Sequence, residues 1–158
     1  MPKEYIHTDE FLTLGPDQRR SVYFALCEHA LTVWENYAAR RTDWEYVESV
    51  LGPRPPAAGT RQAVDQQLPA EALASARQGD DRTNVAQRYL EPIAALQADD
   101  PAFPGAVTFA YYAIYNLFRK YAAQAEVDDW LIVNQALAAE ADPETRRVLL
   151  SHAIQAAG

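Results

Sequence analysis

Cysteine is almost absent from this chain of 158 residues, and long apolar runs are absent altogether. The single cysteine, Cys27, excludes an intramolecular disulfide and a thiolate metal cluster, and its apolar helical surroundings predict a small buried thiol. The longest nearly apolar stretch, Gly105 to Tyr115, is far shorter than the about 20 residues that a membrane helix needs. Because the first residues also lack the layout of a secretory signal, the sequence predicts a cytoplasmic protein.

Positive charge is scarce as well. The chain carries 14 basic and 22 acidic side chains, for a formal net charge of −8. Nucleic acid and anionic membrane surfaces attract basic proteins, so the sequence predicts neither as a partner. An acidic domain associates fastest with a basic protein surface. The alternative is that the negative charge only keeps the protein in solution.

Catalytic and metal-binding motifs are missing too. The three histidines, His7, His29 and His152, are scattered, and none has a second histidine one helical turn away, so we expect no metal and no other cofactor. No nucleophile elbow is present, and the 6 glycines form no loop that would cradle a phosphate. The only lysines, Lys3 and Lys120, lie in no pocket motif.

Apolar residues recur at helical spacing along most of the chain, and no stretch alternates as a strand would. This pattern predicts one all-α domain over residues 1–158, a bundle of six or seven helices. We expect a central hydrophobic helix over residues 106–124, because apolar side chains surround it almost completely. Helical patterns are also found over residues 16–41, 43–51, 127–140 and 143–156, and residues 60–67, 69–78 and 82–98 have helical composition. Residues 8–14 form a short separate segment before Gly15 and Pro16.

Proline and glycine mark the boundaries of these helices. Residues 52–59 (GPRPPAAG) form the clearest internal linker, and their PxxP pattern is typical of a stiff connection or of a docking peptide. Asp142 followed by Pro143 predicts an N-cap and a first helical residue. The middle third has few large apolar residues, so we expect its helices to be short and peripheral.

Acidic doublets and surplus tyrosines are the polar features that stand out. The doublets lie at expected turns or helix starts, where aspartate either caps a helix or faces a partner's basic side chains. Two tyrosines lie on the far side of the expected central helix, where they either complete the core or anchor an interface. The predicted partner-binding residues are Asp80, Asp81, Asp99, Asp100, Tyr112, Tyr115, Asp128 and Asp129.

The N-terminal quarter resembles an uncharacterised family of helical bacterial proteins. In that family a short leucine-rich lead and a proline open a long helix with a Cys-Glu centre and a later Asn-Tyr pair. The matching residues are Leu12, Leu14, Pro16, Cys27, Glu28, Asn36 and Tyr37. The resemblance implies a helical fold and no mechanism.

In general character the chain resembles the small, acidic, all-helical immunity proteins of bacterial polymorphic toxin systems. That resemblance implies a protein-binding module, without enzymatic activity, that neutralises a cognate toxin domain with a basic surface. One alternative is a metal- or small-ligand-binding helical enzyme whose site converges from His29, Glu28, Tyr111 and Asp129. Another is a structural or regulatory homodimer that buries the far face of the central helix.

Overall fold

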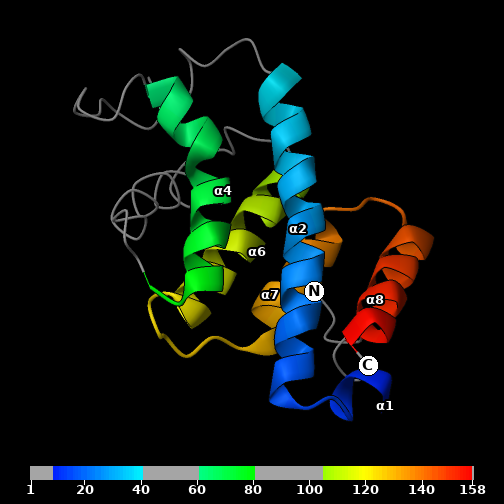
Figure 1. Cartoon of the computed structure of the whole chain (residues 1–158). Coiled ribbons are helices and arrows are strands. Elements are labelled where there is room, and N and C mark those ends of the chain that lie inside the picture. The colour runs from blue at the N-terminus through cyan, green and yellow to red at the C-terminus, as the bar shows by residue number, and fades with distance from the viewer. Residues whose placement is uncertain (1–8, 41–60, 81–104, 158) are drawn as a thin grey trace.

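The all-α prediction is confirmed. The computed structural model describes residues 9–40, 61–80 and 105–157, and these contain six helices and no strand (Figure 1). The helices are α1 (Asp9–Leu12), α2 (Pro16–Arg40), α4 (Arg61–Gln78), α6 (Gly105–Tyr121), α7 (Asp129–Ala138) and α8 (Pro143–Ala157). Among the described residues, no helix combines the length and apolar character that a membrane crossing requires.

The long helix α2 organises the bundle, because it packs against α4, α6, α7 and α8. Figure 1 shows α2 running along the front of the molecule, with α4 on one side and α8 on the other. Pro16 opens the helix, where its missing N–H is no loss. The side of α2 that faces the core is buried, and it includes Val22, Leu26, Cys27 and Trp34.

Cys27 is a buried thiol, as its surroundings predicted. It is completely inaccessible, and its sulfur lies 3.7 Å from the Ala113 carbonyl of α6, to which it donates. Burial raises the pKa of the Cys27 thiol well above its usual value. The thiol therefore stays protonated and packs as a small apolar group.

Helix α6 is the expected hydrophobic helix, and it packs against α2, α4 and α7. It ends at Tyr121, three residues before the predicted end. The chain turns back directly afterwards, because the Ala125 N–H donates to the Arg119 carbonyl at 2.8 Å. Gln124 has a positive φ of 56° within this turn, a conformation that does not continue a right-handed helix.

The prediction of short, peripheral helices for residues 60–67 and 69–78 is wrong. One helix, α4, continues through Pro69 and lies against α6. Its buried side chains are mostly small: Ala72 and Ala76 are fully buried, Ser75 is nearly so, and Leu73 is the one large aliphatic side chain among the buried residues of the stretch 72–76. Small residues let two helix backbones approach closely, so few large apolar residues are needed.

The starts of α7 and α8 show two different uses of aspartate. Asp142 caps α8, since its carboxylate accepts the Thr145 N–H at 3.0 Å and the Thr145 hydroxyl at 2.8 Å. These hydrogen bonds lower the pKa of Asp142. The predicted cap with Pro143 at the first helical position is thereby confirmed. Asp128 occupies the N-cap position of α7 but makes no capping hydrogen bond with its side chain.

Several predicted features lie outside the described residues. They are the linker over residues 52–59 and the helices over residues 43–51 and 82–98.

Candidate functional site

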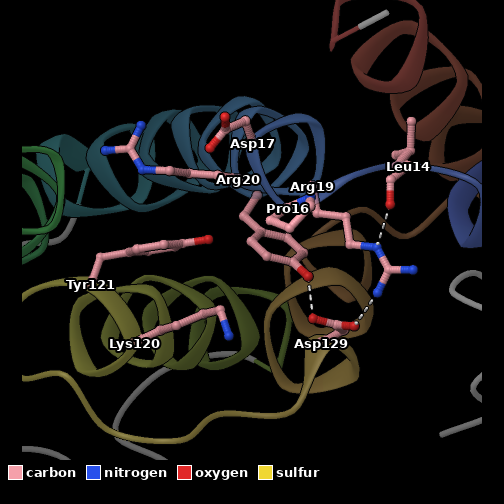
Figure 2. Close-up of a pocket in the computed structure, with 9 residues that line it drawn as sticks. Leu14, Pro16, Asp17, Arg19, Arg20, Lys120, Tyr121 and Asp129 are labelled. Atoms are coloured by element: carbon pink, nitrogen blue, oxygen red, sulfur yellow. Dashed lines mark hydrogen bonds and ion pairs between the residues drawn. The ribbon is translucent and has the colours of Figure 1, made fainter.

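A pocket of about 580 Å³ opens where the start of α2, the end of α6 and the start of α7 meet. It is lined by Leu14, Pro16, Asp17, Arg19, Arg20, Tyr23, Lys120, Tyr121 and Asp129. Three cations, two carboxylates and two phenols therefore share one depression (Figure 2). A concave site with several convergent polar groups is the usual form of a small-molecule site.

One wall of the pocket is a network centred on Asp129, the first residue of α7. The Arg19 guanidinium donates to one Asp129 oxygen at 3.2 Å, and the Tyr23 hydroxyl donates to the other. Arg19 also donates to the Leu14 and Leu12 carbonyls, both at 3.2 Å. Arg19 thus fixes the turn between α1 and α2 to the start of α7 (Figure 2).

Arg20 forms the side of the pocket next to α4. Its guanidinium carbon lies 4.5 Å from the centre of the Phe24 ring and 5.3 Å from that of Tyr121. These are cation–π distances, so the two rings hold the planar group in place. One Arg20 nitrogen donates to the Arg77 carbonyl at 3.4 Å. No described carboxylate forms an ion pair with Arg20.

Lys120 and Tyr121 come from the last turn of α6. The Lys120 ammonium donates to the Val127 carbonyl at 3.4 Å, and among the described residues it forms no ion pair. Figure 2 shows the Lys120 ammonium and the Tyr121 hydroxyl extending in the same direction, toward the side of the pocket that Asp129 closes. The two groups are therefore placed to donate to one bound molecule.

Both phenols of the pocket are held in their protonated form. Burial raises the pKa of Tyr23 far above its usual value, and its hydrogen bond to Asp129 raises it further. Burial also raises the pKa of Tyr121 to about 12, although the nearby Arg20 acts in the opposite direction. At neutral pH each hydroxyl is consequently a hydrogen-bond donor.

The raised pKa of Tyr121 gives a direct prediction. An unfolded tyrosine ionises near pH ~10, so the Tyr121 phenol of the native protein should stay protonated until the pH approaches about 12. The folded pKa lies above the unfolded one, so this group's contribution to stability is full below pH ~10 and is lost as the pH rises toward the folded value. Tyrosinate difference absorbance should show the native step near pH 12 missing from Tyr121→Phe.

Titration in urea supplies the control for this measurement. There wild type and Tyr121→Phe should differ by one tyrosine that ionises near pH ~10. A native difference step at that same ordinary pH would contradict the burial of the Tyr121 phenol.

The structure separates the predicted partner-binding residues into three groups. Asp129 is part of the pocket wall, and its carboxylate, 29% exposed, is already paired with Arg19 and Tyr23. Asp128 is exposed, Asp80 is partly buried after the end of α4, and Tyr112 and Tyr115 are partly buried on α6. Asp81, Asp99 and Asp100 lie outside the described residues.

The residues of the enzyme alternative engage separate partners. Glu28 forms an ion pair with Arg77 of α4, whereas His29 lies 2.5 Å from a Glu140 oxygen beyond α7. Tyr111 is buried, with its ring edge-on to Trp34. Only Asp129 of this set lines the pocket.

Most pocket residues were not predicted from the sequence. Arg19, Arg20 and Tyr23 lie in one helical turn of α2, and Lys120 with Tyr121 follows about a hundred residues later. The one local signal is a pair of adjacent arginines in an acidic chain. Because the pocket forms only where the ends of three helices meet, the residues that line it form no contiguous sequence motif.

Comparison with known proteins adds no further assignment. Searches against protein-family models, curated proteins and solved structures found no match to this chain. Within the described residues, no group of three or more histidine, cysteine or acidic side chains is placed to hold a metal ion.

Proposed function

We propose that this chain is a protein-binding module, and that its concrete role is that of an immunity protein that neutralises a cognate bacterial toxin domain. The observation that carries the proposal is a partly uncovered row of side chains on α6. This α6 strip consists of Phe109, Tyr112, Tyr115 and Arg119. Their spacing of three and four residues places them on one side of the helix.

The α6 strip stands out because every residue between its members is buried. Phe109 is 41% exposed, and Tyr112 and Tyr115 are only partly buried. The Arg119 guanidinium carbon lies 5.9 Å from the centre of the Tyr115 ring, and Arg119 also donates to Asn116 at 3.3 Å. Tyrosine and arginine side chains often supply much of the binding energy at protein interfaces. A row of this composition, in which Arg119 is held against Tyr115, therefore favours a docking surface.

Negative charge near one end of the α6 strip favours a partner with a basic surface. The backbone hydrogen bond from Ala125 to Arg119 keeps the loop after α6 close to that end. Two exposed carboxylates, Glu126 and Asp128, lie in this loop, and the chain as a whole carries a charge of −8. Exposed charges of this kind accelerate association and orient the partner, while the rings supply affinity.

Many other carboxylates already have partners within the chain. Glu28 pairs with Arg77, Asp142 caps α8, and Asp129 belongs to the pocket network. The proposal therefore assigns the interface to the α6 strip and the loop after it, and it excludes Asp129 from the interface.

The proposal predicts that a neighbouring gene encodes the cognate toxin domain, and that domain is the partner used in the test. We expect a stoichiometric complex, and we expect Phe109→Asp to weaken it at least tenfold by placing a charge in the ring-rich strip. Val148→Asp on α8 is the matched control, because Val148 is 43% exposed and lies outside the strip. Raising the salt from ~0.05 M to ~0.5 M should slow association, since exposed charges are screened over that range.

Three results would contradict parts of this proposal. Unchanged binding by Phe109→Asp would remove the α6 strip from the interface. Association that is insensitive to salt would remove the electrostatic contribution. If the chain alone is a dimer in solution and Phe109→Asp makes it a monomer, the strip is a homodimer interface instead.

A further inference from the structure

We propose that the pocket between α2, α6 and α7 binds a small organic carboxylate. This proposal concerns the chain alone and does not depend on a partner protein. The residues that carry it are Lys120 and Tyr121 as donors, with Arg20 beside them.

The net positive charge of the side chains that line the pocket favours an anionic ligand. The protein as a whole has a charge of −8, yet the pocket residues include Arg19, Arg20 and Lys120 against Asp17 and Asp129. Three cationic and two anionic side chains leave one net positive charge. Only Arg19 is neutralised directly, by Asp129 at 3.2 Å. Within the described part of the chain, Arg20 and Lys120 form no ion pair, so their charge is available to a ligand.

A single net charge favours a monoanion over a dianion. A carboxylate is matched by the charge of Lys120 and accepts hydrogen bonds from both Lys120 and the Tyr121 hydroxyl. A phosphate dianion would add a second negative charge close to Asp17 and Asp129, and like charges held together in a pocket repel. The pocket therefore fits a carboxylate better than a phosphate.

The apolar walls of the pocket favour an organic ligand. Leu14, Pro16 and the rings of Tyr23 and Tyr121 supply apolar surface beside the charged groups. A volume of about 580 Å³ lies in the range that holds small metabolites. The raised pKa of Tyr121, about 12, keeps its hydroxyl a donor at neutral pH. An aliphatic or aromatic monocarboxylic acid satisfies both the charge and the apolar walls.

The test is a protein-observed NMR titration of the full chain with benzoate and hexanoate. Benzamide, which has the shape of benzoate without its charge, serves as the neutral control, and inorganic phosphate serves as the dianionic probe. We expect saturable shifts for residues around Tyr121 with both carboxylates and none with benzamide. Losing one charge-assisted hydrogen bond should weaken binding roughly tenfold in Lys120→Gln. Tyr121→Phe should weaken it several-fold while keeping the ring.

Arg147→Gln is the control variant, since Arg147 is exposed on α8 and does not line the pocket. It should bind benzoate as the wild type does. Thermal unfolding of every variant separates lost binding from lost folding. The proposal is overturned if neither carboxylate gives saturable shifts, or if Lys120→Gln and Tyr121→Phe both fold and retain wild-type affinity. Tighter binding of phosphate than of benzoate would overturn the choice of a monoanion.

Discussion

Trp34→Ala should lower the free energy of unfolding by about 3–5 kcal/mol, the usual cost of deleting a fully buried large aromatic side chain. Trp34 is completely inaccessible in the middle of α2. Its ring meets Tyr111 of α6 edge-on, with centroids 5.1 Å apart, and lies 6.0 Å from Tyr37. Removing the indole therefore leaves a cavity between the two helices that organise the bundle.

Urea unfolding followed by far-UV circular dichroism measures this loss without depending on tryptophan fluorescence. Because small domains are stable by only about 5–15 kcal/mol, the midpoint should shift strongly. Trp34→Phe, which keeps a ring, should cost clearly less. Leu12→Ala is the exposed control, since Leu12 is 52% exposed, and it should change stability by less than about 1 kcal/mol. A loss below about 1 kcal/mol for Trp34→Ala would show that this part of the core is loosely packed.

The sequence predicted those helices whose periodicity involves large apolar residues. Val22, Leu26 and Trp34 recur along α2 at intervals that only a helix places on one face, and the structure buries all three. The extent of helix α4 was not predicted, because the side chains that it buries are mostly small, as Ala72 and Ala76 are. Alanine occurs both on exposed helix faces and in close helix contacts, so its position in the sequence does not reveal which it occupies.

The pocket could not be predicted, for a different physical reason. Its side chains come from three helix ends, and which ends meet depends on the packing of the whole bundle. Asp129 illustrates the difficulty. As part of an acidic doublet it was expected to face a partner, and nothing in the sequence indicates that Arg19 and Tyr23, both more than 100 residues earlier, donate hydrogen bonds to it. No local pattern in the sequence records such a long-range pairing.

Asp129→Ala should lower the free energy of unfolding by about 1–3 kcal/mol, because it leaves the Tyr23 hydroxyl and one Arg19 donor without their acceptor. The Arg19 and Asp129 side chains are each 29% exposed, so water can compensate in part, and we expect less than for a fully buried pair. Urea midpoints measure the loss. Asp129→Asn keeps an acceptor for Tyr23 and should cost less.

A double-mutant cycle with Tyr23→Phe tests whether these groups act as a unit. Residues that share a hydrogen bond should show a coupling energy of about 0.5–3 kcal/mol, whereas additive losses would contradict the network. Glu144→Ala is the control: its carboxylate lies 3.8 Å from Arg147 at the exposed start of α8, so it should be additive with Tyr23→Phe.

The same Asp129 variants should change stability and ligand binding in opposite directions. Asp129→Asn removes one of the two carboxylates of the pocket, which raises the pocket's net charge and leaves Arg19 without its counter-ion. Benzoate should therefore bind more tightly to Asp129→Asn than to wild type, although the variant is less stable. Weaker binding together with lower stability would mean that Asp129 shapes the pocket more than it opposes the ligand's charge.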